Sequence, residues 1–186
     1  MEKINKEKLI KIVKKAKRGD EKAFSYLYEY YISPIFRFIY FRIKSYEEAE
    51  DLTQAVFLKA WNALPNYQQK KNPFSSWLYT IARNTIIDYW KKRKEWKISD
   101  LARDTIKDSR RPIYDLIEEE EDFRVVKEAI SLLSEDQQEV IILKFIEELS
   151  NKEIAKIMNK KEDAIRQLQS RAIKSLKEYL NKDYER

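Results

Sequence analysis

The sequence contains a single glycine, Gly19, and only four prolines in 186 residues. Glycine supplies the positive-φ positions that tight turns and most two-residue hairpin loops require. A chain with one glycine therefore has few places to form β-hairpins. Lysine, glutamate, leucine and alanine are frequent instead, and these residues favour helices. The composition predicts an all-α protein.

Cysteine and histidine are both absent. Their absence excludes disulfides, thiolate nucleophiles, Cys/His zinc sites and imidazole acid–base chemistry. The sequence also lacks a glycine-rich phosphate loop. We therefore expect no catalytic residue, no metal, no cofactor and no small-molecule substrate. The alternative is an all-helical enzyme that uses carboxylates, but the acidic residues fall mostly at helix starts or in the expected linker.

No segment of the chain approaches the ~20 apolar residues of a membrane span. Residues 1–15 alternate lysine with apolar residues and lack the unbroken apolar stretch of a signal peptide. We therefore expect a cytoplasmic protein without a membrane span.

The charge is unevenly distributed between the two halves. Residues 1–98 carry a net charge of +10 and residues 99–186 carry −4, which together give the formal +6. A basic half suggests a polyanionic partner for part of the surface. The alternative is a charge that only keeps a helical protein soluble.

Apolar residues recur at helical spacing in the N-terminal half. The spacing predicts helices over about 6–17, 20–40, 47–64 and 73–94. Gly19 is expected to end the first helix, and Pro34 is expected to kink or break the second.

The helical pattern weakens between Ile98 and Arg124 and then resumes. Two capping boxes mark helix starts in the C-terminal part, Ser134 with Gln137 and Ser150 with Glu153. We expect two small helical domains, residues 1–97 and 123–186, joined by a flexible charged linker at residues 98–122.

A helix–turn–helix pattern lies between Asn151 and Ser170. Ile154, Ala155 and Met158 face inward from a short helix, and Asn159 occupies the turn. The exposed side of the second helix offers residues that could contact duplex DNA in the major groove. These residues are Lys160, Lys161, Arg166, Gln167, Ser170 and Arg171. The alternative is an ordinary helical hairpin with a solvated polar face.

The segment 49–61 has apolar residues on two sides. One side fits a core, and the other mixes a carboxylate, an amide and two large hydrophobic side chains. Such a mixture suits a protein–protein contact. This second side consists of Asp51, Gln54, Leu58 and Trp61. The alternative places Leu58 and Trp61 in the core of a thick bundle.

The fourth expected helix alternates aromatic and basic residues. Aromatic rings stack on unpaired bases and cations follow the phosphates, so the combination suits single-stranded or partly melted DNA. Phe74 and Leu78 are expected to be internal. The run Lys91–Lys94 could alternatively be a solvated helix end.

The segments GDEKAFSYLYEYY, AEDLTQAVFLKAW and FSSWLYTIARNTIIDYWKKRK resemble region 2 of the extracytoplasmic-function (ECF) class of bacterial sigma factors in the sigma-70 family. The segment LSEDQQEVIILKFIEELSNKEIAKIMNKKEDAIRQLQSRAIKSL resembles their region 4. The resemblance covers almost the whole chain. It implies a factor that binds core RNA polymerase and directs transcription initiation at specific promoters.

The resemblance also implies roles for particular segments. The stripe from Asp51 to Trp61 would bind the polymerase clamp helices, residues near Lys144–Phe145 would contact the flap, and the helix from Lys161 would read the −35 element as duplex. The loop 66–72 and the following helix would capture the melted −10 element. The residues expected on that face are Asn66, Trp77, Arg83, Asn84, Tyr89, Lys91, Lys92 and Arg93. An anti-sigma factor is a possible further partner.

The chain departs from the family pattern at two positions of the C-terminal motif. Asn159 replaces the usual turn glycine, and Ala164 stands where a hydroxyl residue is common. The alternative function is a stand-alone helix–turn–helix regulator that binds duplex operator DNA without polymerase. The aromatic and basic fourth helix argues against it, because a protein that reads only duplex DNA has no need for such a helix.

Overall fold

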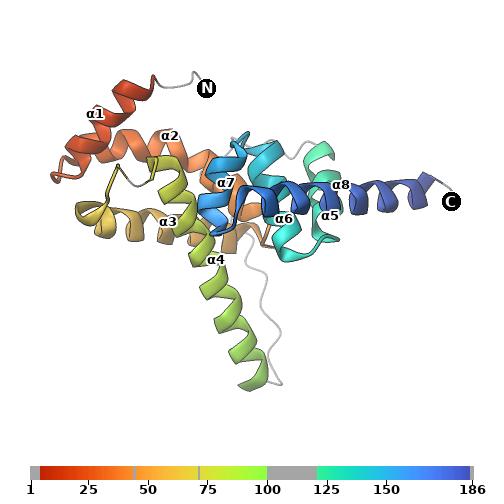
Figure 1. Cartoon of the computed structure of the whole chain (residues 1–186). Helices are drawn as coiled ribbons and strands as arrows, with labels where there is room; N and C mark the ends of the chain where they lie inside the picture. The colour runs from red at the N-terminus through yellow and green to blue at the C-terminus, as the bar shows by residue number, and fades with distance from the viewer. Residues whose placement is uncertain (1–4, 44, 71, 100–120, 185–186) are drawn as a thin grey trace.

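The computed structural model describes residues 5–43, 45–70, 72–99 and 121–184, which contain helices and no strand. The helices are α1 (Lys6–Ala16), α2 (Glu21–Tyr40), α3 (Tyr46–Ala63), α4 (Phe74–Ser99), α5 (Glu121–Ser131), α6 (Glu135–Ile141), α7 (Asn151–Met158) and α8 (Glu162–Tyr184) (Figure 1). A 3₁₀ turn follows α3 at Leu64–Asn66, and a π-helical turn follows α6 at Ile142–Ile146. The all-α prediction is confirmed. Most of the expected linker, residues 100–120, lies outside the described residues.

Local signals set the ends of the first helices. Gly19 adopts a φ of +89° after α1, a conformation that side chains with a Cβ rarely take. Asp20 then caps α2, because its Oδ1 accepts a hydrogen bond from the Ala23 N–H at 3.0 Å. Ser45 does the same for α3, where its Oγ accepts from the Glu48 N–H at 3.2 Å. The chain therefore turns between α1 and α2 where the sequence predicts it.

Pro34 lies inside α2 and does not break it, although the sequence allowed a break. Proline lacks the N–H that would bond one turn back. The cost is offset by packing, since Ile35, Phe38 and Ile39 directly after it are fully buried. Tertiary contacts thus keep α2 continuous from Glu21 to Tyr40.

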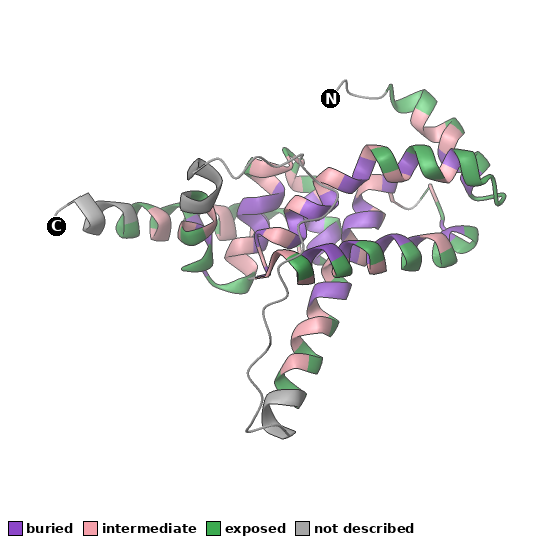
Figure 2. Ribbon diagram, turned by 180° about the vertical axis from the view of Figure 1, so that it is seen from behind, coloured by how far each residue is buried: buried purple, intermediate pink, exposed green. Residues whose placement is uncertain are grey.

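Helices α1–α4 form an N-terminal bundle. Helix α2 packs against α1 and α3, and α4 packs against α2 and α3. Phe38, Leu78 and Ile86 are completely or almost completely buried at its centre, and the Phe38 and Tyr79 rings meet edge to face at 5.4 Å. The later turns of α4 extend away from the bundle, and they carry exposed and half-buried residues (Figures 1 and 2).

Helices α5–α8 form a C-terminal bundle around α8, which packs against α5, α6 and α7. Both predicted capping boxes are present, at Ser134 and at Ser150. Asn159 ends α7 in the left-handed conformation, with φ 52° and ψ 48°. The Lys160 N–H donates to the Ala155 carbonyl at 2.9 Å, which closes the turn into α8.

The two bundles pack against each other. Helix α7 of the C-terminal bundle lies on α4 of the N-terminal bundle. In Figure 1 the C-terminal bundle sits beside α2 and α4, with the far end of α8 pointing away from both. The structure therefore places in direct contact two domains that the sequence predicts only as separate units on a linker.

The turn at Asn159 gives a stability prediction. Replacing Asn159 with alanine should lower the free energy of unfolding by about 1 kcal/mol. The left-handed conformation costs a residue with a Cβ ~1–2 kcal/mol, and asparagine offsets part of this cost by local hydrogen bonding that alanine lacks. Asn159→Gly should leave the free energy of unfolding unchanged or raise it slightly. Denaturant titration of both variants beside the wild type measures the difference. An equal loss of stability in both variants would show that the amide, and not the backbone conformation, stabilises the turn.

Candidate nucleic-acid interface

Helices α7 and α8 have the geometry of a helix–turn–helix. Ile154, Ile157 and Met158 of α7 are buried, and Ala155 is 8% exposed where the helices approach. Ile165 and Ala172 of α8 are fully buried in the same contact. The small side chain at residue 155 permits a close crossing, so α7 supports α8 with one face of α8 left free. A single α-helix presented in this way fits the major groove.

The predicted duplex-contacting residues lie mostly on the free face of α8. Lys161, Arg166, Gln167, Ser170 and Arg171 are all exposed. Arg166 forms an exposed ion pair with Asp163 one turn earlier, at 3.2 Å. Such a surface pair contributes little and can exchange for DNA.

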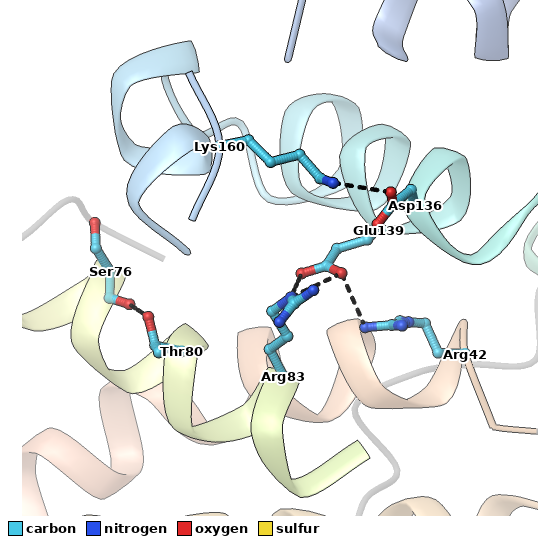
Figure 3. Close-up of polar contacts among 7 residues, drawn as sticks. All are labelled: Arg42, Ser76, Thr80, Arg83, Asp136, Glu139 and Lys160. Carbon is cyan, nitrogen blue, oxygen red and sulfur yellow. Dashed lines mark hydrogen bonds and ion pairs between the residues drawn. The ribbon is translucent and has the colours of Figure 1, made fainter. Parts of the chain in front are cut away.

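Lys160 differs from the other predicted duplex contacts. It is half-buried, and its Nζ lies 3.0 Å from Asp136 Oδ2 of α6 (Figure 3). This ion pair connects the turn of the helix–turn–helix to α6. Lys160 therefore has a structural partner that the sequence spacing did not indicate.

The basic end of α4 presents a second charged surface. Asn84, Lys91 and Lys92 are exposed, whereas Tyr89 and Arg93 are half-buried. Arg93 donates to the Tyr89 hydroxyl and to Glu48 Oε2 of α3, the latter at 3.3 Å. Arg93 is thus tied to the bundle, and the exposed lysines are the cations free to meet a phosphate.

Trp77 lies at the other end of α4, beside the loop that precedes the helix. It is half-buried, with its ring 4.8 Å from the ring of Tyr67 and 5.4 Å from that of Phe74. Phe74 and Leu78 are buried, as predicted. Trp77 therefore belongs partly to the packing of this loop and keeps some of its surface accessible.

Tyr67 anchors the same loop, and the sequence pattern did not single it out. Its hydroxyl donates to the Asn72 carbonyl at 2.7 Å, and its own carbonyl accepts from Lys17 Nζ at 2.6 Å. Burial raises the pKa of Tyr67 to about 12, so the hydroxyl stays protonated and continues to donate. Asn66, just before it, is exposed. The only local signal of this role is an aromatic residue in a polar loop, between Asn66 and Gln68.

A pocket opens beside this loop. Gln69, Lys70 and Asn72 line one side, and Leu9 and Val13 of α1 contribute an apolar wall. Lys156 of α7 also lines it. The C-terminal bundle therefore reaches the loop to which the family resemblance assigns the melted DNA.

Arg83, one of the predicted DNA contacts, is paired with an acidic residue of the other bundle. Its Nε donates to Glu139 Oε2 of α6 at 3.1 Å and lies 2.8 Å from Oε1 (Figure 3). Arg42, just after α2, approaches the same carboxylate at 3.6 Å. The Glu139 side chain is only 2% exposed. Arg83 is therefore paired across the two bundles in this arrangement.

A second carboxylate of the C-terminal bundle makes a similar contact. Glu147 accepts from Arg37 Nε and Nη2, both at 3.2 Å, and from the Tyr79 hydroxyl at 2.8 Å. Burial raises the pKa of Tyr79 well above its usual value, so its hydroxyl remains a donor. The sequence pattern indicated no role for Glu139, Glu147, Arg37 or Arg42.

The predicted protein-contact stripe lies on the outside of α3. Asp51, Gln54 and Leu58 are exposed, and Leu58 is 64% exposed despite being fully apolar. Trp61 is half-buried and meets Phe24 edge to face at 4.7 Å. The alternative prediction places Trp61 and Leu58 in the core of the bundle. It is correct in part for Trp61 and wrong for Leu58.

Metal sites and membrane spans are two further classes of feature that a helical protein can carry. In the part of the chain that the structure describes, no group of three or more acidic side chains could hold a metal ion. None of the described helices combines the length and the apolar character that crossing a bilayer requires.

The fold and these surfaces define a helical DNA-binding protein with a helix–turn–helix in its C-terminal half. Comparison with known families shows to which family of DNA-binding proteins the chain is similar. The family model for sigma-70 region 2 matches residues 27–95, and that for sigma-70 region 4 matches residues 123–176.

Individual relatives agree with the family models. The ECF RNA polymerase sigma factor BldN of Streptomyces coelicolor is 32% identical over 177 residues, which cover 95% of this chain and 67% of BldN. The ECF RNA polymerase sigma factor SigM of Bacillus subtilis is 31% identical over 158 residues, 84% of this chain and 94% of SigM. Among solved structures, the sigma factor RpoE in complex with the anti-sigma factor NepR from Bartonella quintana has a TM-score of 0.68 and 29% identity, covering 86% of this chain and 98% of that one.

This chain belongs to the ECF RNA polymerase sigma factors. It is therefore a sigma factor, a DNA-binding protein of transcription initiation. The alternative of a stand-alone regulator is not favoured, because both sigma regions are matched in order along one chain.

The exposed lysines of α4 give a prediction about salt dependence. Changing both Lys91 and Lys92 to alanine should reduce the dependence of single-stranded DNA affinity on salt, by ~0.7 in the log–log slope for each phosphate that the variant no longer neutralises. Titration of a random-sequence single-stranded pool at several salt concentrations measures the slope. Lys22→Ala, at an exposed position of α2, is the control and should leave the slope unchanged. An unchanged slope in the double variant would mean that the run is only a solvated helix end.

Proposed function

We propose that this sigma factor divides promoter recognition and polymerase binding among four surfaces. The exposed stripe of α3, formed by Asp51, Gln54, Leu58 and Trp61, binds the clamp helices of core RNA polymerase. Leu58 supports this role best, because a leucine that is 64% exposed on a stable helix is suited to be an anchor for a partner protein. Phe145, which is 56% exposed after α6, contributes to docking of region 4 on the flap.

The C-terminal surface reads the −35 element as duplex DNA. Arg166, Gln167 and Ser170 lie on the exposed face of α8, where their side chains can reach base edges. Arg171 and the lysines at 160 and 161 then meet phosphates, which fix the position of the helix in the groove without reading sequence.

The N-terminal surface holds the melted −10 element. Asn66 and Trp77 flank the loop anchored by Tyr67, and a base extruded from the stack can be read there. The phosphates then follow α4 toward its exposed end. The residues of that track are Arg83, Asn84, Tyr89, Lys91, Lys92 and Arg93.

One observation gives this proposal its strongest support. The chain presents two separate nucleic-acid faces, a duplex-reading helix α8 and an aromatic and basic helix α4, on two bundles. A promoter-opening factor needs both kinds of face, because it contacts paired and unpaired DNA at the same time.

The remaining assignments follow from membership of the family. We propose domain limits of 1–97 for region 2 and 123–186 for region 4, with residues 98–122 between them. The protein works in the cytoplasm, where its polymerase is. The solved relative RpoE is in complex with an anti-sigma factor. An anti-sigma factor is therefore a partner to seek for this chain too.

Run-off transcription with purified bacterial core polymerase over a promoter library tests the proposal. We expect transcripts that depend on this protein and share two upstream sequence elements. The Leu58→Asp variant should lose polymerase binding and transcription but unfold within about 0.5 kcal/mol of the wild type, because the substitution is at the surface. If the wild type forms no complex with cognate core polymerase, the proposal is wrong.

The duplex-reading role of α8 gives a separate prediction. Arg166→Ala should weaken binding to the preferred −35 duplex by about 1–3 kcal/mol and relax the base preference at one position. Competition between duplexes that differ at single base pairs measures this change. A uniform loss of affinity on all duplexes would instead assign Arg166 to a phosphate.

A further inference from the structure

Two buried carboxylates of region 4 join the two domains. Glu139 and Glu147 each have a side chain that is only 2% exposed, and each contacts region 2. Arg83 and Arg42 surround Glu139, while Arg37 and the Tyr79 hydroxyl hold Glu147. We refer to these six residues as the interdomain ion-pair cluster.

We propose that the cluster holds the free sigma factor in an autoinhibited, closed arrangement, in which carboxylates of region 4 occupy cations that region 2 needs for DNA. This inference rests on the proposed function, because it uses the assignment of α4 to the melted −10 element. The cluster belongs to this chain alone and needs no anti-sigma factor to form.

Distance along the promoter supports the inference. The −35 and −10 elements are about 25 base pairs apart, roughly 85 Å of duplex at 3.4 Å per base pair. In the closed arrangement Arg83 Nε lies 2.8 Å from Glu139 Oε1, so the two domains are in direct contact. The cluster must therefore break before both elements are bound.

The contacts on region 2 support it further. Arg83 is one of the cations assigned to the phosphate track, and in the closed arrangement Glu139 already neutralises it. The Glu139 carboxylate accepts a charge-assisted hydrogen bond from Arg83 Nε that a phosphate oxygen could otherwise accept. Lys156 of region 4 also lines the pocket beside Lys70 and Asn72 of the −10 loop. Region 4 thus contacts the middle of the α4 face at Arg83 and the pocket beside the −10 loop, and it leaves Lys91 and Lys92 exposed.

The ion-pair contacts that hold the closed arrangement are weak enough for the domains to separate again. Burial raises the pKa of Glu139 and of Glu147 above the ordinary value, even though neighbouring arginines act to lower both. Arg42 Nη1 makes no hydrogen bond to any described residue. A buried charge with incomplete hydrogen bonding destabilises the closed arrangement. Contact of the same group with solvent or with DNA in the open arrangement relieves that cost. The cluster therefore specifies one arrangement without making it permanent.

A cation–π contact adds a third point of attachment. Lys127 Nζ of α5 lies 3.3 Å from the centre of the Tyr40 ring of α2. Lys127 is half-buried in this contact, and its burial lowers the pKa of its ammonium group to about 8. The domains are thus held at α2 and α4 together.

The test measures the separation of the domains in the full chain. The protein has no cysteine, so Ser25→Cys on α2 and Lys177→Cys on α8 accept two spin labels at exposed positions. The labelled parent should give a narrow distribution of short distances. Arg37→Glu places two carboxylates together at Glu147, so it should shift the distribution to longer and broader distances. Adding Glu147→Arg restores an opposite pair and should restore the short distance.

The second measurement asks whether closure hides the DNA face. Arg37→Glu should raise affinity for a random-sequence pool of single-stranded 20-mers about tenfold, as expected if the open form is populated at about one tenth in the parent. The substitution makes the chain more acidic, so charge alone would weaken binding. Lys22→Glu, at an exposed position of the same helix, is the charge-matched control and should neither open the protein nor raise affinity.

Each outcome decides the inference. Unchanged distances in Arg37→Glu and in a second variant, Glu139→Lys, would overturn the ion-pair cluster as the contact that holds the domains together. Longer distances without a gain in affinity would overturn autoinhibition. Circular dichroism on each variant separates domain opening from unfolding, and Arg37 is partly exposed, so its replacement should leave the bundle folded. The distance measurement uses neither polymerase nor promoter, so failure of the proposed function would appear separately as a wild type that does not bind core.

Discussion

Glu139 and Glu147 place two negative charges where water barely reaches, and the relative position of the two domains depends on how those charges are met. An isolated buried carboxylate costs several kcal/mol, so each one requires a cation or a donor at a defined place. Arg42, Arg83 and Arg37 supply the cations, and the Tyr79 hydroxyl supplies a further donor. Helix α7 packs on α4, and the Arg83 Nε–Glu139 Oε1 pair at 2.8 Å adds a directional contact between α4 and α6. The ion pairs therefore constrain how the two bundles pack against each other.

This arrangement treats the two DNA faces differently. Arg166, Gln167 and Ser170 remain exposed on the free face of α8. The face of α4 loses Arg83 to Glu139 and shares its loop pocket with Lys156. Duplex recognition is thus available in the closed arrangement, while capture of a melted strand is restricted. Such an asymmetry would let region 4 meet DNA before region 2 is released.

Much of the local structure could be predicted because its causes lie within a few residues. The capping boxes at Ser134 and Ser150, the left-handed Asn159 and the burial of Phe74 and Leu78 all depend on neighbours within one or two turns of helix. The exposure of Leu58 also agrees with the spacing of its stripe. Pro34 shows the limit of such signals, since the buried residues after it keep α2 continuous where a local rule allowed a break.

The sequence by itself determined the helical class and the helix–turn–helix, because periodicity, caps and composition act over short stretches of chain, and its resemblance to a known family indicated the two sigma regions. Only the tertiary structure decided which polar residues are free. Arg83 and Lys91 are both cations on α4, yet the first is paired with a residue 56 positions away and the second is exposed. Arg37 and Glu147 are separated by 110 positions and meet only because the two bundles pack. No spacing rule connects such residues, because they meet only when the folded surfaces of the two bundles pack together. Packing removes their charges from water, so each buried charge requires an opposite charge beside it.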